Sequence, residues 1–163
     1  MTQTLWAPWR MAYIEGTDKV KQQGCVFCLP PDHLGPMAER LVLYSDDLTI
    51  VIMNLYPYNN GHLLVAPRRH VNSLSLTTES ERLALMNLTV RATEALEKAQ
   101  KAQGFNLGIN QGTVAGAGIT DHLHLHVTPR YLGDVNFMTV LSETRVIPEH
   151  IEATYQRLLG FFQ

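Results

Sequence analysis

The segment DHLHLHVTPR, residues 121–130, places a histidine at every second position, with an apolar residue between each pair. In a β-strand alternate side chains share a face, so His122, His124 and His126 project together, with roughly 7 Å between neighbours along the strand. The intervening apolar residues then face the core. Because burying three imidazoles without partners costs a few kcal/mol each, their face either packs under a polar layer or lines a functional site.

The residues alone leave three interpretations of this histidine row. It can be a polar strand face, or it can ligate zinc, since a His-x-His pair presents two nitrogens to a metal that activates water. Alternatively, one imidazole can be a nucleophile whose neighbours fix its tautomer. The preceding loop contains Gly112, Gly116 and Gly118. Glycines let backbone N–H groups approach an anion closely, so the loop and the histidines together favour a phosphate that a histidine attacks.

Five runs rich in β-forming residues predict five strands. They cover residues 40–45, 48–54, 62–67, 105–110 and 122–129. Asp46 and Asp47 separate the first two runs and predict a hairpin, and Pro67 is expected to end the third strand.

Two helices complete the prediction. The longer one begins after Thr78, which forms a capping box with Glu81, and is expected to stop at Gly104. A C-terminal helix begins at about Pro148 and carries an apolar stripe. Strands on both sides of one long helix predict an α+β fold, with a five-stranded antiparallel sheet covered on one face.

Composition narrows the class of protein. The 163 residues suit a single domain, residues 1–163, in which residues 1–39 form an irregular N-terminal segment. With 13 basic and 15 acidic residues, the chain lacks the positive excess of a protein that binds long nucleic acid. It also lacks an apolar run long enough to span a membrane, and its N-terminus does not resemble a signal peptide. We therefore predict a cytoplasmic protein without a nucleic-acid or membrane partner.

The motif HLHLHVT resembles the signature of the histidine triad (HIT) superfamily, in which histidines alternate with apolar residues. The resemblance extends through NLYPYNNGHLLVAPRRHV and GFNLGINQGTVAGAGITDHLHLHVTPR, and it covers about Tyr44 to Pro148. These segments are similar to the branch with bacterial diadenosine tetraphosphate phosphorylases and related dinucleoside polyphosphate hydrolases. The resemblance implies a homodimer whose sheets join, a small nucleotide substrate, and nucleotidyl transfer to phosphate or water.

The resemblance also implies roles for individual residues. His124 would attack the α-phosphorus through one ring nitrogen while the other donates to a backbone carbonyl, and His126 would donate a hydrogen bond to the same phosphate. The implied substrate-binding residues are Asn54 for ribose, His62 near the polyphosphate, and Asn110, Gly116, Ala117 and Gly118 in the phosphate loop. No glutamine lies near Gly118, where many HIT hydrolases have one. The sequence therefore does not decide whether phosphate or water accepts the nucleotidyl group, although this style of loop favours phosphorolysis.

The two cysteines of the chain, Cys25 and Cys28, form a Cys-x-x-Cys pair, which in a reducing compartment is more often a metal or redox site than a disulfide. Alternatively, they are two small buried apolar side chains. Similar bacterial HIT proteins bind zinc through such a pair, a histidine after the third strand and the first triad histidine. The resemblance thus implies structural zinc held by Cys25, Cys28, His70 and His122, pinning the N-terminal segment, with His33 as a rival ligand.

Two rival functions remain. A zinc-dependent hydrolase would use all three triad histidines as ligands, and a nucleotide-binding regulator would have little or no activity.

Overall fold

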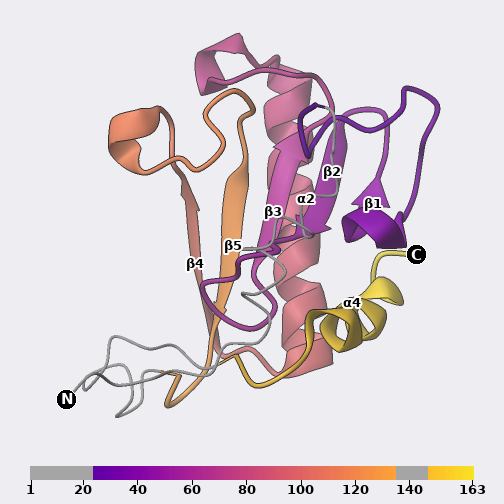
Figure 1. Ribbon diagram of the computed structural model, residues 1–163, viewed down its shortest axis with the longest axis vertical. Helices are drawn as coiled ribbons and strands as arrows, with labels where there is room; N and C mark the ends of the chain where they lie inside the picture. Colours follow the sequence, from indigo (N-terminus) through magenta and orange to yellow (C-terminus); the bar gives the residue numbers. More distant parts are fainter. Residues whose placement is uncertain (1–23, 135–146) are drawn as a thin grey trace, which may run out of the picture.

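The computed structural model describes residues 24–134 and 147–163, so residues 1–23 of the predicted N-terminal segment lie outside the described part. Its strands are β1 (Val42–Ser45), β2 (Thr49–Met53), β3 (Leu63–Pro67), β4 (Gly104–Ile109) and β5 (Leu125–Arg130). They form one antiparallel sheet in the order β1-β2-β3-β5-β4 (Figure 1). The helices are α2 (Glu79–Gln100) and α4 (Ile151–Leu159), with short 3-10 turns at Ala38–Arg40, Leu74–Leu76 and Thr113–Ala115. The predicted α+β fold is confirmed.

The turn between β1 and β2 is the predicted hairpin. Asp46 closes it, because its carboxylate accepts hydrogen bonds from the backbone N–H groups of Leu48 and Thr49, at 2.9 and 2.6 Å. A short acidic side chain at this position replaces part of the strand ladder with local hydrogen bonds.

Apolar residues cover both faces of the sheet over its first three strands. One cluster lies between the sheet and the two helices, and it includes Val51, Val65 and Leu96. The other lies on the opposite face and consists of Phe27, Val42, Ile50, Ile52, Leu64 and Ala66. The expectation of a sheet covered on one face is therefore wrong for these strands. Every residue of β2 and β3 is buried, and such strands require apolar cover on both faces.

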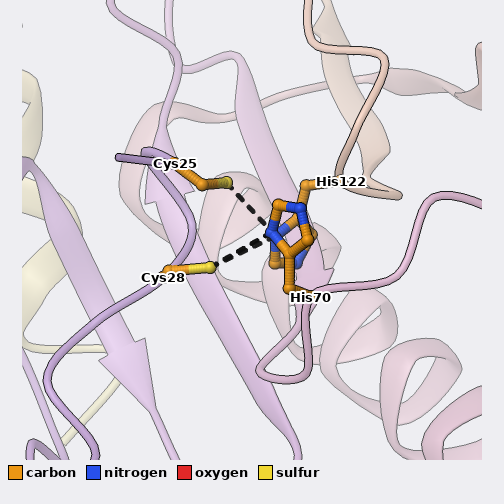
Figure 2. A group of neighbouring side chains, drawn as sticks. All are labelled: Cys25, Cys28, His70 and His122. Carbon is orange, nitrogen blue, oxygen red and sulfur yellow. Dashed lines mark hydrogen bonds between the residues drawn. The ribbon is translucent and has the colours of Figure 1, made fainter. Parts of the chain in front are cut away.

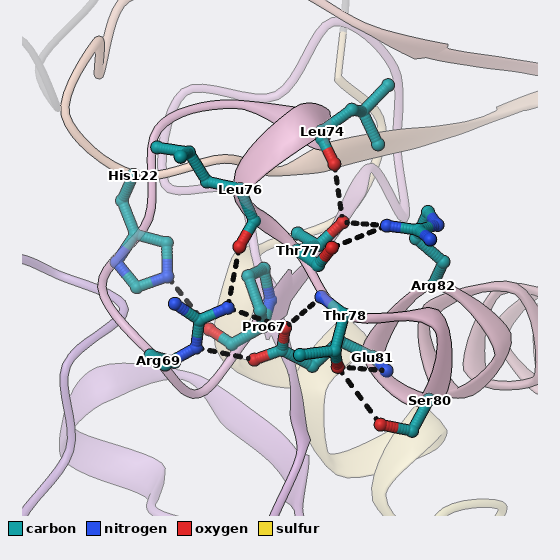
Figure 3. A network of polar contacts seen from close by, with 10 residues as sticks. All are labelled: Pro67, Arg69, Leu74, Leu76, Thr77, Thr78, Ser80, Glu81, Arg82 and His122. Carbon is teal, nitrogen blue, oxygen red and sulfur yellow. Dashed lines mark hydrogen bonds and ion pairs between the residues drawn. The ribbon is translucent and has the colours of Figure 1, made fainter.

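Helix α2 begins with the predicted capping box. The Thr78 hydroxyl accepts from Glu81 N–H at 3.2 Å, and the Glu81 carboxylate accepts from Thr78 N–H at 2.7 Å. Both carboxylate oxygens of Glu81 also accept from Arg69, at 2.9 and 2.8 Å (Figure 3). This pairing holds the turn after β3 against the start of the helix. The helix ends at Gln100, not at Gly104, because Lys101 adopts the left-handed conformation and Gly104 already begins β4.

The C-terminal helix begins later than predicted, at Ile151 after the N-cap residue His150. Tyr155 anchors it to the sheet, since its buried hydroxyl donates to the carbonyl of Val42 at 2.9 Å. Within residues 24–134 and 147–163, no helix combines the length and the apolar character needed to cross a membrane.

Candidate active site and metal centre

The three triad histidines lie at the start of β5 and just before it. Strand β5 begins at Leu125, so the prediction that the strand starts at His122 is wrong in its first three residues. In this segment the chain instead pairs with the turn after β3, where Leu123 N–H donates to Val71 O at 2.6 Å. The alternation nevertheless continues, because Leu123, Leu125 and Val127 are all buried.

One hydrogen bond orients the middle imidazole. His124 Nδ1 lies 2.9 Å from the carbonyl oxygen of His122. A carbonyl can only accept, so Nδ1 carries a proton, and in the neutral ring the lone pair lies on Nε2. The ring is buried, with 5% of its residue surface exposed. The hydrogen bond therefore selects the tautomer with its proton on Nδ1.

A second hydrogen-bond chain fixes the tautomers of His62 and His126. Tyr58 N–H donates to His62 Nδ1 at 3.1 Å, so this histidine carries its proton on Nε2. His62 Nε2 lies 2.9 Å from His126 Nδ1, to which it donates. His126 therefore carries its own proton on Nε2, and that buried atom has no partner within the described part of the chain. The site thus presents an N–H donor beside the His124 ring, whose centroid is 5.0 Å from that of His126.

His62 and His126 are held in the neutral form. Burial, together with the neighbouring His126 and His124, lowers the pKa of His62 to about 3. Burial also lowers the pKa of His126, with His124 adding to the shift. Because both rings are neutral, the hydrogen bond between them keeps one fixed direction.

The lowered pKa of His62 predicts a loss of stability in mild acid. The unfolded chain binds a proton below its ordinary pKa of about 6.5, whereas folded His62 does not until about pH 3. Stability is therefore fully present above pH 6.5 and falls as the pH drops toward 3, by about 2 kcal/mol at pH 5 from this group. Denaturant unfolding at pH 7 and pH 5 measures the change. His62→Gln, which cannot take up the proton, should show a smaller loss between these pH values; an equal loss would contradict the assignment.

The glycine loop between β4 and β5 supplies backbone donors. Gly112 and Gly116 have φ of 86° and 80°, which side chains disfavour. The N–H of Gly116 donates to Thr113 O at 3.1 Å, so it is already used within the loop. By contrast, no hydrogen bond engages the N–H groups of Ala117 and Gly118 in the described part of the chain. Asn110 directly follows β4 and is half-buried at the start of the same loop.

Asn54, the predicted ribose ligand, sits at the end of β2 and contacts His62. Its Nδ2 lies 3.1 Å from His62 Nδ1, and its Oδ1 accepts from Tyr56 N–H at 3.0 Å. An amide oxygen has two acceptor positions, so Oδ1 can still accept one further hydrogen bond. The side chain thus organises the loop that carries His62.

The four predicted metal ligands lie together (Figure 2). The ligand atoms of Cys25, Cys28, His70 and His122 all lie within 4.8 Å of one another. The Cys25 sulfur is 3.3 Å from His122 Nδ1, and the Cys28 sulfur is 3.3 Å from His70 Nδ1 and 3.7 Å from His122 Nδ1. Around tetrahedral zinc, sulfur and nitrogen ligands are separated by about 3.6 Å, given the usual bond lengths. The donor set therefore fits zinc in type, number and spacing.

Two further observations support this fit. His122 Nε2 donates to Pro67 O at 2.8 Å, which leaves Nδ1 unprotonated and directed at the sulfurs. Burial and the neighbouring Cys25 raise the pKa of the Cys28 thiol, so two thiolates at this point need a cation. Four protein ligands leave no open position for a substrate. The rival ligand His33 is not in this group, and within the described residues no other such group of three or more is present.

The sequence did not single out Phe27, Tyr58 or Arg40. Phe27 stacks on His124, with ring centroids 5.1 Å apart, and Tyr58 stacks on His126 at 5.8 Å. The guanidinium of Arg40 donates to the carbonyls of Cys25, Val26 and Cys28. The position of Phe27 between the two cysteines was the one feature of the sequence that could have indicated a role near the site. No sequence pattern indicates that Arg40 binds these carbonyls.

Alternating imidazoles beside a glycine loop, on a five-stranded antiparallel sheet, define a histidine triad protein. A family model described as the HIT domain matches residues 36–133, more than half of the chain, so the chain belongs to the HIT family.

Named relatives and a solved structure add detail. The chain is 39% identical to a protein of Mycobacterium tuberculosis named AP-4-A phosphorylase, over 97% of this chain and 83% of that protein. It is 36% identical to the bis(5'-nucleosyl)-tetraphosphatase [asymmetrical] of Schizosaccharomyces pombe, over 74% of this chain and 63% of that protein. A Zn-bound histidine triad family protein from Mycobacterium smegmatis superposes with a TM-score of 0.65 at 27% identity, covering 86% of this chain and 94% of that one.

Proposed function

We propose that this protein transfers a nucleotidyl group from a dinucleoside polyphosphate, diadenosine tetraphosphate in the first instance, to inorganic phosphate or water. One observation carries the proposal. The hydrogen bond from His124 Nδ1 to the His122 carbonyl selects the tautomer whose lone pair is on Nε2. The names of the two relatives, a phosphorylase and a tetraphosphatase, point to the same class of substrate.

The first chemical step forms a covalent intermediate. Nε2 of His124 attacks the α-phosphorus, and the bond from phosphorus to the bridging oxygen breaks, so the leaving nucleoside polyphosphate takes the electron pair. The Nε2–H of His126 donates to an oxygen of the same phosphate as negative charge develops. Because Nδ1 of His124 keeps its proton, the positive charge on the phosphorylated ring faces the His122 carbonyl.

The second step returns the enzyme to its starting state. Phosphate or water attacks the phosphorus, the N–P bond breaks, and the lone pair returns to Nε2 of His124. The amides of Ala117 and Gly118 hold phosphoryl oxygens in both steps, with Gly116 shaping the turn that presents them. We assign His62 to the support of His126, Asn54 to ribose, and Asn110 to the phosphate loop.

We further propose that Cys25, Cys28, His70 and His122 hold structural zinc. When bound there, zinc would supply a cross-link between the N-terminal segment and the residues beside β5. A three-histidine zinc hydrolase gains no support, because His124 and His126 do not belong to the four-ligand group.

We also propose a homodimer and a cytoplasmic location. A homodimer with joined sheets is supported by β4, which forms an edge of the sheet and leaves Leu107 52% exposed. A cytoplasmic location is consistent with two free thiols at a metal-competent site. The single domain spanning residues 1–163 stays a prediction.

Product analysis tests the reaction. Diadenosine tetraphosphate is incubated with the protein, with and without inorganic phosphate, and nucleotides are separated by chromatography. We expect ADP and ATP only when phosphate is present, because the adenylyl group is transferred to it. AMP and ATP without phosphate would identify a hydrolase of the same mechanism. Absence of both products, together with no acid-labile adenylyl group on His124 after quenching, would contradict the proposal and favour a nucleotide-binding regulator.

A further inference from the structure

Phe27 links the two sites described above. It lies between Cys25 and Cys28 in sequence, and its side chain is completely buried in the second apolar cluster. Its ring lies nearly parallel to that of His124, with centroids 5.1 Å apart and an interplanar angle of 26°. It is also 5.1 Å from the ring of His122, at 49°. One aromatic ring therefore contacts both a metal-ligand candidate and the nucleophile.

The contact supplies a restraint that His124 otherwise lacks. Its hydrogen bond to the His122 carbonyl fixes one ring nitrogen but still permits the ring plane to tilt about the N–H···O axis. Phe27 stacks on one side of the ring at an interplanar angle of 26°, and the centroid of the His126 ring lies 5.0 Å away at an angle of 59°. A fixed ring plane directs the Nε2 lone pair, and misplacement of a reacting atom by about 1 Å can lower a rate by about 100-fold.

The turn from Cys25 to Cys28, here called the cysteine knuckle, holds Phe27 in place. Cys28 N–H donates to Cys25 O at 3.1 Å and closes the turn. From outside, Arg40 donates to three carbonyls of the knuckle, at 3.2, 2.9 and 3.0 Å. The sulfurs face His70 and His122 (Figure 2). The turn that carries Phe27 is therefore held by Arg40 on one side and lies against the four-ligand group on the other.

We propose that Phe27 is a positioning residue through which metal binding at the cysteine knuckle sets the orientation of His124. The proposal rests on the proposed function for its kinetic consequence, whereas the orientation of the ring can be measured independently. The metal site then contributes to the rate without contacting the substrate.

Phe27→Leu tests the proposal, because leucine remains apolar but has no ring to lie against His124. We expect the variant to keep its zinc, measured by atomic emission. The single-turnover rate of adenylyl transfer to His124 should fall about 10- to 100-fold with little change in KM. In NOE spectra of the histidine side chains, the cross-peaks between the ring protons of His124 and His126 should weaken relative to the wild type, because the plane of the His124 ring is no longer fixed. The spectra need no turnover, so they still test the positioning if the proposed reaction is wrong.

Ile50→Ala is the matched control. Ile50 is completely buried in the same cluster and, having no ring, cannot stack on a histidine. The variant should be destabilised at least as much as Phe27→Leu, yet retain the wild-type rate and the wild-type cross-peaks between the His124 and His126 rings when both are assayed well below their Tm. Equal rate losses in the two variants would overturn the proposal, because they would show a general effect of core damage.

Removal of zinc with a chelator is the second test of the proposal. Removing zinc from the wild type should slow adenylyl transfer by a factor close to that of Phe27→Leu, whereas chelating the variant should add little, because the route is already interrupted. If the two losses multiply, the metal and the ring act independently and the inference is wrong. Unchanged cross-peaks between the His124 and His126 rings in Phe27→Leu would likewise overturn it.

Discussion

The variant His124→Asn is expected to lose turnover of diadenosine tetraphosphate by about 10⁴-fold or more, while its fold persists. The asparagine amide can donate to the His122 carbonyl as Nδ1 does, so the buried contact at 2.9 Å is retained. The variant has no ring nitrogen that could attack phosphorus. Steady-state rates by chromatography, together with denaturant unfolding, measure the two effects separately.

His150→Asn is the control for this loss. His150 is the N-cap residue of α4, and its side chain is 82% exposed, so the same substitution there should leave turnover unchanged. An adenylyl group trapped on another residue, or near-normal turnover in His124→Asn, would show that the middle imidazole is not the nucleophile.

His126→Asn should cause a smaller loss of turnover, of about 100-fold, because it removes a hydrogen-bond donor but leaves the attacking group.

The double variant Cys25→Ser, Cys28→Ser is expected to bind no zinc and to be several kcal/mol less stable than the wild type. A cross-link between the knuckle and two distant histidines is lost, and serine hydroxyls are poor replacements for thiolates. A loss of about 4 kcal/mol in a chain of this size lowers Tm by about 10 °C. Calorimetry and metal analysis after gel filtration measure both effects.

His33→Gln separates the two candidate ligand sets. The His33 ring is outside the four-ligand group, so this variant should retain one zinc per chain and an unchanged Tm. Zinc lost from His33→Gln, or retained by the double cysteine variant, would contradict the assigned ligands. Wild type treated with a chelator should show the same fall in Tm as the double variant, and added zinc should reverse it.

The sequence predicted those parts of the fold that depend on patterns within one element. Alternation in residues 122–127, the capping box of Thr78 and Glu81, and the Asp46 hairpin each arise from local geometry that repeats along a few residues. The end of α2 could not be read in this way. Gly104 suits a helix terminus as well as the start of a strand, and pairing with Arg130 of β5 decides between them.

In the candidate sites, too, local patterns could be predicted and long-range contacts could not. The resemblance to HIT proteins proposed Cys25, Cys28, His70 and His122 together, and the fold brings them within reach of one another. The contact between Phe27 and His124 joins segments 97 positions apart, as does the bond between Cys25 and His122. Such contacts follow from the packing of the whole chain and have no counterpart in a local pattern.

Two arginines have partners that no sequence pattern indicates. Arg68 donates to the carbonyls of Pro30 and His33, and Arg130 forms an ion pair with Asp134. Their charges and donors are thus used to hold loops. Backbone carbonyls as partners cannot be recognised from residue types.

The start of β5 has a consequence for how the chain avoids misfolding. Because side chains alternate, slipping this segment by a single position would turn its three imidazoles into the apolar interior and its leucines outward. The same slip would carry His122 away from the sulfur of Cys25, which lies 3.3 Å from its ring in the native alignment. An incorrect register would therefore lose both the burial of the apolar side chains and the proposed metal site. Metal binding by the cysteines would thus favour the correct strand register.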